Sequence, residues 1–525
     1  MWSSIEKYND IINDIIWTKI GIWLLLLSGI IFTILNRGFQ IRRLGYWMKK
    51  TVGSLFNDKV KGNDKNSKAD KASISQFQVV CTSLAATLGV GNIAGVAAAI
   101  TTGGPGAVFW MWMAALFGMM TSFFENVLGI YYRRKNHDGE WSGGAMYYLR
   151  DGFGGFKHTK RFGKFLASVF AVCTILASFG IGNMGQVNKI VINITDAFRI
   201  KSLSKHVLYT SGDTDITLYM LILGLILMVF VAIVLLGGIK RTASVAEKIA
   251  PFMIIAYILG SVIIVIGNAG EVPEAIKSIF SMAFTKKAAW GGAAGITFKT
   301  IITVGCRRGM FSNEAGLGST VMINANSNVV EPVKQGMWGM FEVFADTIVV
   351  CTLTALTVLT SGVVDLKTGV AITNNDATLV ADAFNTVFRV GNLRLGKYFI
   401  ALSIMLFALS TIPGWAHYGV KAVEYLAGKK AKTAILIYKI IFIGMIVLGA
   451  IITSNLAWGI SDTFNGMMKI PNMIGVLTLS PLVLKITKNY VDRRIHGKEG
   501  IRPMLSHDPD IEEEGIRLIE ETGEE

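Results

Sequence analysis

Two neighbouring hydroxyl residues in an uncharged stretch are the first candidates for chemistry. Ser410 and Thr411 are followed by Pro413-Gly414-Trp415, which supply a helix distortion and an aromatic side chain. Hydroxyl and carbonyl oxygens suit an alkali cation, by extension from the preference of other hard cations for oxygen ligands. Alternatively, both hydroxyls bond back to carbonyls one turn earlier in their own helix. The pattern indicates either a cation site or ordinary helix packing.

Glycines interrupt a second uncharged stretch at Gly89-Val90-Gly91-Asn92. In a continuous helix each glycine costs up to about 1 kcal/mol relative to alanine. A break would expose backbone N–H and C=O groups, which lipid cannot satisfy but a carboxylate and a cation can. Close helix packing through small residues is the alternative. The spacing is not G-x-G-x-x-G, so we exclude a dinucleotide site.

A third apolar stretch carries charges between Gly305 and Gly318. Charges at membrane depth are costly unless they pair or face water. We expect Arg307 and Arg308 to pair with Glu314, Glu342 or Asp346 as a structural latch. The better pocket candidates are Phe311 and the neighbouring glycines. In another Gly-rich stretch, Gln186 either contacts a substrate or bonds a neighbouring helix.

The elements that must position these residues are transmembrane helices. Of the 525 residues 52% are hydrophobic and 17% are charged, and the mean hydropathy is +0.49, which excludes an ordinary soluble protein. The apolar runs reach the roughly 20 residues of a membrane crossing and do not alternate as barrel strands do. We predict an all-α integral membrane protein with eleven spans, at 15–35, 76–101, 106–131, 164–192, 217–237, 245–267, 293–326, 337–361, 398–426, 434–455 and 460–486.

The net charge is +15, and the basic residues are concentrated in alternate loops. This distribution favours a role in membrane orientation over nucleic-acid binding. Alternate loops hold 33 Lys and Arg residues on one side and 11 on the other. The positive-inside rule therefore predicts an N-terminus outside and a C-terminus in the cytoplasm. The four cysteines all lie in apolar segments without paired spacing, so no disulfide framework or zinc site is expected.

The two interrupted spans begin corresponding halves of the chain. They are the first and sixth of ten spans that follow one extra N-terminal span, as an inverted repeat requires. We predict an extra helix and amphipathic linker at 1–71, a first five-helix repeat at 72–268, a second at 269–487 and an acidic cytoplasmic tail at 488–525. We expect the stretch from Asp508 to Glu525 to be flexible.

Taken together, these segments resemble the alanine or glycine:cation symporter family, also called sodium:alanine symporters. The similar motifs are Gly103 to Gly118, Gly91-Asn-Ile-Ala-Gly-Val, Phe311-Ser-Asn-Glu-Ala-Gly-Leu-Gly, Ala345-Asp-Thr and Asn465 to Asn472. The resemblance extends from about residue 15 to 490. It implies a LeuT-like fold with a 5+5 inverted repeat, in which the first and sixth core helices are unwound.

The resemblance also implies a function and a site. The protein would be a plasma-membrane symporter that imports alanine or glycine with Na⁺, without an organic cofactor or covalent chemistry. The implied substrate-binding residues are Gly89, Gly91, Asn92, Gln186, Phe311, Thr411 and Trp415. The implied sodium ligands are the carbonyls of Ala85 and Leu88 and the hydroxyls of Ser410 and Thr411.

Other functions remain open at this point. A proton-coupled carrier of the same fold is the closest alternative, because the sequence does not discriminate Na⁺ from H⁺. A channel is less favoured, since paired broken helices suggest an occluded midplane site and not a continuous pore. An intramembrane enzyme would need a nucleophile and base or metal ligands on adjacent turns, and we find no such spacing. The sequence also leaves open the oligomeric state and the preference between alanine and glycine.

Overall fold

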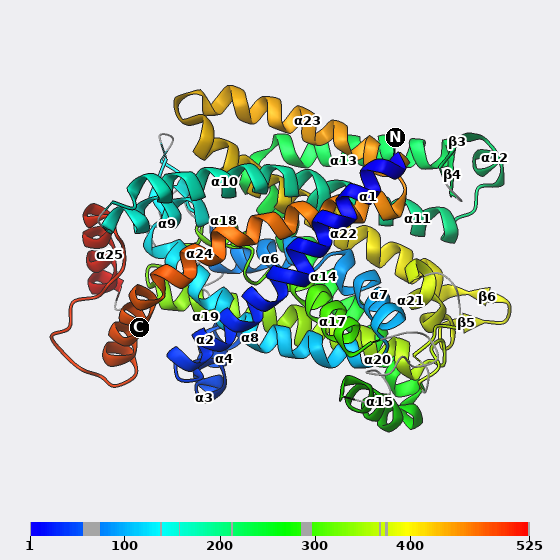
Figure 1. Ribbon diagram of the computed structural model, residues 1–525, viewed down its shortest axis with the longest axis horizontal. Helices are drawn as coiled ribbons and strands as arrows, with labels where there is room; N and C mark the ends of the chain where they lie inside the picture. Colours follow the sequence, from blue (N-terminus) through cyan, green and yellow to red (C-terminus); the bar gives the residue numbers. More distant parts are fainter. Residues whose placement is uncertain are drawn as a thin grey trace.

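The computed structural model of the protein consists almost entirely of helices. Most of the long helices pack side by side along the long axis of the molecule (Figure 1). It describes residues 2–55, 74–136, 139–156, 158–211, 214–284, 297–366, 369–372 and 376–522. Helices are what this apolar sequence should form, because a helix satisfies its backbone hydrogen bonds within one segment. The predicted all-α architecture is confirmed.

The N-terminal part leads into the first five spans. Its elements are α1 (Trp2–Asn13), η1 (Asp14–Gly21), α2 (Ile22–Leu35), α3 (Phe39–Arg42), α4 (Leu44–Lys50) and η2 (Val52–Ser54). They are followed by α6 (Gln76–Thr87), η3 (Val90–Asn92), α7 (Ala94–Gly103), α8 (Gly106–Tyr131), α9 (Ala145–Gly152), η4 (Phe153–Gly155), α10 (Lys160–Phe179), η5 (Gly180–Met184), α11 (Gly185–Ala197), α12 (Lys201–Ser204), α13 (Leu218–Leu236), α14 (Gly238–Gly267) and η6 (Ala269–Glu271).

The second half also contains a broken helix that is followed by long helices. Its elements are α15 (Val272–Phe284), α17 (Phe298–Asn313), α18 (Val321–Asn324), α19 (Pro332–Val343), η7 (Phe344–Cys351), α20 (Thr352–Thr360), α21 (Asp376–Asn385), α22 (Leu395–Ala427), η8 (Gly428–Lys430), α23 (Ala431–Ile451), α24 (Ser454–Arg494) and α25 (Pro509–Thr522). Among them η7 is π-helical, as are η1 and η5, whereas η2, η3, η4, η6 and η8 are single 3-10 turns.

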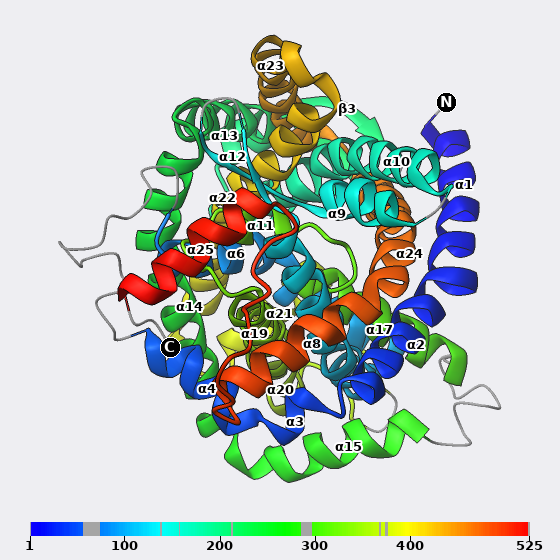
Figure 2. The same ribbon diagram turned by 90° about the vertical axis from the view of Figure 1, so that its left-hand side faces the viewer.

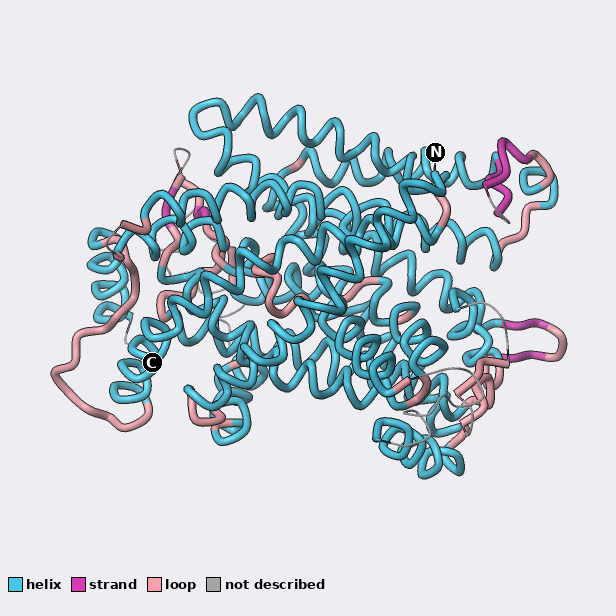
Figure 3. Tube along the Cα trace, in the orientation of Figure 1, coloured by secondary structure: helices cyan, strands magenta, loops and turns pink. Residues whose placement is uncertain are grey.

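The described strands form three small antiparallel hairpins in connecting segments, as the magenta stretches of Figure 3 show. They are β1 (Arg134–Lys135) with β2 (Trp141–Ser142), β3 (Val207–Ser211) with β4 (Thr214–Thr217), and β5 (Arg389–Val390) with β6 (Leu393–Arg394). In the same tube, loop stretches also lie among the helices in the middle of the molecule.

Eight stretches of the described chain are long and apolar enough to cross a membrane. These stretches do not correspond one to one to the predicted spans. One of them, Leu395–Ile451, contains both α22 and α23. In the two interrupted segments, each helical piece is too short to be counted as a membrane crossing. Multiple crossings are thus established, while the number eleven and the division at residues 71, 268 and 487 stay predictions. The predicted linker up to residue 71 falls largely on 56–73, outside the described residues.

The side chains divide into a buried interior and an apolar exterior. Large apolar groups are exposed on α13, α14 and α23, for example Ile226 (59%), Phe252 (66%) and Ile440 (61%). In Figure 2 these three helices lie toward the outside of the bundle, away from its axis. Apolar surface on this scale needs lipid to cover it.

The C-terminal segment differs from the prediction of a flexible tail. Helix α24 continues to Arg494, and α25 forms a further helix from Pro509. The turn between them is tied to the end of α8, because the backbone N–H of His507 donates to the Tyr131 carbonyl at 2.8 Å. Lys135 also pairs with Glu514 at 3.2 Å. Within the described residues the acidic tail thus forms a helix that contacts the end of α8.

The orientation of the chain is open to a labelling test. We expect a cysteine in place of Asp10 to react with a membrane-impermeant thiol reagent in intact cells, and one in place of Glu520 to react only after lysis. Both positions are exposed, and the native cysteines Cys81, Cys173, Cys306 and Cys351 are buried, so background should be low. The reverse pattern would invert the assignment of every loop.

Candidate functional site

The first interrupted helix stops and restarts at the glycines that the sequence marks. Helix α6 begins with a capping box between Ser75 and Gln78 and ends at Thr87, and α7 begins at Ala94. Between them Gly89 is extended, with φ −119° and ψ −156°, before the single turn of η3. The ends of two short helices therefore face each other, leaving carbonyls of α6 and amides before α7 without partners in their own helix.

Four oxygen atoms from α6 and α22 meet at this break. The Thr411 hydroxyl lies 2.9 Å from the Ala85 carbonyl oxygen and 3.4 Å from that of Leu88. The Ser410 hydroxyl lies 3.3 Å from the same Ala85 oxygen. The structure thus brings together the four predicted sodium ligands. We call these atoms the four-oxygen cluster.

The same hydroxyls also reach the carbonyl of their own helix one turn earlier. Ser410 and Thr411 lie 2.8 and 2.9 Å from the Phe407 carbonyl oxygen. Each hydroxyl has one proton to donate. Each hydroxyl can therefore donate either to Phe407, with its lone pairs toward the carbonyls at the break, or to those carbonyls, of Ala85 for both hydroxyls and also of Leu88 for Thr411. The back-bonding that the sequence offered as an alternative is present, and a role of these oxygens in holding a cation stays a prediction.

Gln186 and Gly89 lie beside this cluster. The Gln186 side-chain oxygen accepts from the Val90 N–H at 3.3 Å, and its amide donates to the Ile181 carbonyl at 3.2 Å. A Cβ at Gly89 would come within 3.0 Å of the Thr411 hydroxyl and 3.2 Å of the Gln186 amide. Glycine is needed here for this close approach. In this conformation Gln186 holds the broken segment.

Asn92 and Gly91 face the second half of the chain. The Asn92 amide donates to Asp346 at 2.7 Å, and its oxygen accepts from the Gly89 N–H at 3.0 Å. A Cβ at Gly91 would meet the Phe311 ring at 3.6 Å, so these two residues are neighbours as predicted. Asn92 thus fixes the shape of the turn and ties it to η7.

Trp415 is buried one turn beyond Thr411. It packs on Gly182 of η5, and its ring meets Tyr418 edge to face at a centroid distance of 5.2 Å. It also hydrogen-bonds to Glu314 in the second broken helix. These contacts place Trp415 between η5 and the second break, and its role as a wall of the substrate pocket stays a prediction.

The second interruption occupies the later part of the stretch between Gly305 and Gly318 that the sequence marked. Helix α17 is intact from Phe298 to Asn313, so the arginines lie within a helix and not in a break. Glu314, Gly316 and Gly318 then have φ values of +57°, +88° and +70°. Glycines tolerate this left-handed region, which explains their spacing after the helix end.

Glu125 of α8 holds this second break, and sequence reasoning missed it. Its carboxylate accepts from the backbone N–H groups of Gly316 at 3.2 Å and Gly318 at 3.0 Å. The Asn472 amide donates to the same carboxylate and to the Gly316 carbonyl. A single carboxylate in the otherwise uncharged span 106–131 was the available signal, because an ionisable residue within a membrane span is a functional candidate by default.

The predicted latch partner of Arg307 is wrong. Its guanidinium forms an ion pair with Asp462 of α24, and not with Glu314, Glu342 or Asp346. The reason is that α17 remains helical through this region, which directs Arg307 toward α24. Arg308 lies over the Trp458 ring, 5.4 Å from its centroid.

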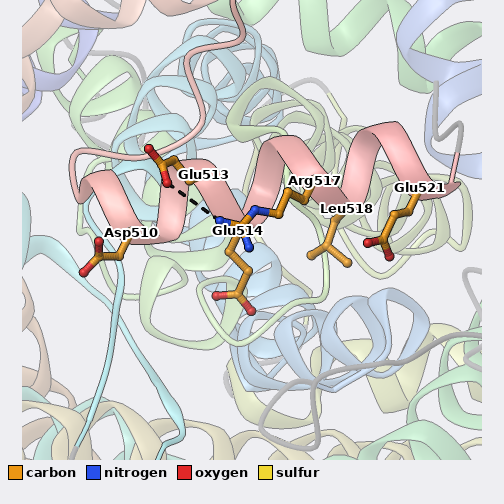
Figure 4. Close-up of a pocket in the computed structure, with 6 residues that line it drawn as sticks. All are labelled: Asp510, Glu513, Glu514, Arg517, Leu518 and Glu521. Carbon is orange, nitrogen blue, oxygen red and sulfur yellow. Dashed lines mark ion pairs between the residues drawn. The ribbon is translucent and has the colours of Figure 1, made fainter.

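A surface pocket elsewhere does not compete with this site. It is lined by six residues of α25, namely Asp510, Glu513, Glu514, Arg517, Leu518 and Glu521 (Figure 4). Its carboxylates are exposed on the C-terminal helix, where they would repel a substrate carboxylate. Within the described residues no group of three or more His, Cys, Asp or Glu side chains could hold a metal ion.

Sequence comparisons relate this chain to known transporters. The family model described as "Sodium:alanine symporter family" matches residues 2–503. The chain is 39% identical to the sodium/alanine symporter AgcS of Methanococcus maripaludis over 92% of its own length and 96% of that protein. It is 36% identical to an uncharacterized transporter of Haemophilus influenzae, with coverages of 93% and 97%.

A solved structure independently supports the fold. The crystal structure of MhsT in complex with L-phenylalanine superposes with a TM-score of 0.50 and 11% identity, over 79% of this chain and 98% of that one. At this identity the likeness concerns the fold alone, and it confirms the predicted LeuT-like architecture. With a family model that covers nearly the whole chain, the protein belongs to the sodium:alanine symporter family.

Proposed function

We propose that the protein is a sodium-driven symporter that imports alanine or glycine by alternating access. The observation that carries this proposal is the four-oxygen cluster, because it joins a broken helix to α22 with oxygen atoms alone. Membership of the family and the similarity to a sodium/alanine symporter support the choice of ion and substrate. In this account sodium is cargo, and the chain makes no covalent bond with either solute.

The substrate would bind between the two breaks. The amides that precede α7, near Gly91, and the positive end of that half-helix suit a carboxylate. Backbone carbonyls freed at the second break, with the Gln186 oxygen, would accept from the ammonium group. Phe311 beside Gly91 and Trp415 beside Glu314 would limit the side chain of the substrate. The small neutral amino acids fit such a site best.

The proximity of the two sites supplies the coupling. Leu88 immediately precedes Gly89 and Ala85 lies about one turn earlier, and the residues that follow Gly89 would meet the substrate. A cation that holds these carbonyls against Thr411 also orders the turn that receives the carboxylate. Each solute should therefore raise the affinity for the other by the same factor.

Uptake into proteoliposomes tests this proposal and its main alternative. With a sodium gradient and no proton gradient we expect concentrative uptake of radiolabelled alanine, reduced by unlabelled glycine. With a proton gradient and potassium in place of sodium, we expect only equilibration. Uptake driven by a proton gradient alone would favour a proton-coupled carrier. A flux that does not saturate with alanine concentration under either gradient would favour a channel.

The aromatic side chains should set selectivity. We expect Trp415→Ala and Phe311→Ala to admit valine or leucine as competitors of alanine binding, because each removes a rigid wall from a small pocket. One methylene that fits changes discrimination by only about 1–3 kcal/mol, so strong rejection of leucine requires such walls. Competition binding with purified variants checks this. Phe442→Ala, which removes a buried phenylalanine of α23, serves as the control. An unchanged ranking in both pocket variants would exclude these residues from the pocket.

A further inference from the structure

Four side chains that carry polar atoms follow one face of α24, and none of them is assigned to the proposed substrate or sodium site. Trp458, Asp462, Asn465 and Lys469 are spaced by four, three and four residues, which places them on the same side of a helix. Asp462 is 3% exposed, and Asn465 and Lys469 are fully buried. Asn465 and Lys469 also belong to the motif Asn465 to Asn472. Within that motif only Asn472 has a role described above, at the second break.

Lys469 is an unusual buried lysine. Its ammonium nitrogen lies 3.3 Å from the centre of the Trp17 ring and has no hydrogen-bond acceptor among the described residues. Lys421 shows what a buried lysine normally requires, since it donates to the Trp141 carbonyl at 3.2 Å and to Glu424 at 3.1 Å. An ammonium group without an acceptor is costly inside a membrane protein unless a proton leaves or an acceptor arrives.

The groups around Lys469 include both charges and unpaired polar atoms. Arg307 lies over the same Trp17 ring at 5.6 Å and pairs with one oxygen of Asp462. The second Asp462 oxygen, both polar atoms of Asn465 and the Arg307 Nε have no partner among the described residues. The indole N–H of Trp17 donates to the Asp462 backbone carbonyl at 2.8 Å, and this bond connects η1 to the cluster.

Charged groups on the other packed elements are directed elsewhere. Asp14 and Lys19 of η1 are exposed. On α8, Glu125 is engaged by Asn472 and the second break, and on α9 Tyr148 bonds to the same Asn472. Lys160, Arg161 and Lys164 lie at the outer end of α10, near its first residue. Arg307 shares the Trp17 ring with Lys469 and is itself paired with Asp462.

This mixture of atoms selects among possible ligands. A bound anion would face the Asp462 carboxylate, and a metal cation would face Lys469 and Arg307. Water, by contrast, needs two to four donors and acceptors around it, which these unpaired atoms provide. A hydrated pair of an amine and a carboxylate can pass a proton, the role that intramembrane ionisable residues have in pumps and transporters.

We propose that Lys469, assisted by Asp462, is a proton-exchange site linked to transport. The lysine nitrogen binds one proton from water and later returns it to water or to the carboxylate, so that one N–H bond forms and breaks without any redox change. The link to transport is α17, because Arg307 of this cluster lies one turn before Phe311. The inference rests on the proposed function for its substrate.

Calorimetry tests the inference without requiring transport. Alanine is titrated into purified protein in sodium at several pH values between about 6 and 9, in buffers with different ionisation enthalpies, which yields the number of protons exchanged. We expect exchange in the wild type and its loss in both Lys469→Met and Lys469→Arg. These variants differ in charge, but neither side chain can exchange a proton. The control Lys421→Met should exchange protons as the wild type does.

The two substitutions separate proton exchange from a structural role. If Lys469 only packed on Trp17, arginine would preserve the wild-type behaviour and methionine would not. Retained exchange in either folded variant therefore overturns the inference, and so does a wild type that binds alanine without proton exchange at every pH. That second result needs no variant to fold. It would leave the proposed function intact, whereas absence of any alanine binding in sodium would remove both.

Discussion

Thr411→Val is expected to weaken the apparent affinity for sodium by about 10- to 100-fold. Valine keeps the shape of the side chain but removes the oxygen that lies 2.9 Å from the Ala85 carbonyl and 3.4 Å from the Leu88 carbonyl. Contacts to a charged group are worth about 1.5–3 kcal/mol, and each 1.4 kcal/mol is a factor of ten. The sodium dependence of alanine uptake measures the change, and Ser410→Ala should act in the same direction.

A matched control separates this effect from the loss of a buried hydroxyl. Thr487 of α24 is also buried, and its hydroxyl bonds back to the Val483 carbonyl at 2.8 Å. Thr487→Val should therefore leave the sodium dependence unchanged. If the Thr411 and Ser410 variants also retain wild-type sodium dependence while expression is normal, the four-oxygen cluster is not the cation site.

Glu125→Gln is expected to reduce alanine uptake by at least about tenfold. The carboxylate accepts from two backbone N–H groups, of Gly316 and Gly318, and from the Asn472 amide. An amide offers one acceptor oxygen and adds N–H donors, so at least one buried donor loses its partner. Such a loss costs about 1–3 kcal/mol, and it falls on the backbone of the second break. Initial uptake rates and thermal melting of the purified variant measure it.

The control for this variant is a carboxylate that joins two helices away from the breaks. Glu247 of α14 accepts from the Gln78 amide of α6 at 2.9 Å and is only half-buried. Glu247→Gln should change the uptake rate by less than about twofold, since a partly exposed pair contributes little. Equal uptake in wild type and Glu125→Gln would show that the carboxylate does not maintain the second break.

Local patterns explain which parts of this architecture could be predicted. Gly89 and Gly91 marked the first break, because glycine is poorly suited to the middle of a helix. The same reasoning marked four glycines, Gly305, Gly309, Gly316 and Gly318, as the second break. In the structure Gly305 and Gly309 are helical and lie close to the backbone of α8, whereas the positive φ values begin at Glu314. Small residues for helix packing and glycines for a turn look alike in sequence.

Partners that lie far apart in sequence could not be predicted from spacing. The pairing of Arg307 with Asp462 spans 155 residues and depends on how α24 packs against α17. The hydrogen bonds of Glu125 to Gly316 and Gly318 also join residues that are far apart in sequence, with separations of 191 and 193 residues. In contrast, the resemblance to a family supplied Ala85 and Leu88 as neighbours of Ser410 and Thr411, which the structure places together although their binding roles await experiment.

Binding of alanine to the purified protein in sodium and in potassium tests the central claim most directly. If the four-oxygen cluster holds sodium next to the turn that receives the substrate, alanine affinity should rise with sodium concentration, and alanine should raise sodium affinity by the same factor. In Thr411→Val this reciprocal effect should require much higher sodium. Equal alanine affinity in saturating sodium and in potassium would contradict the account.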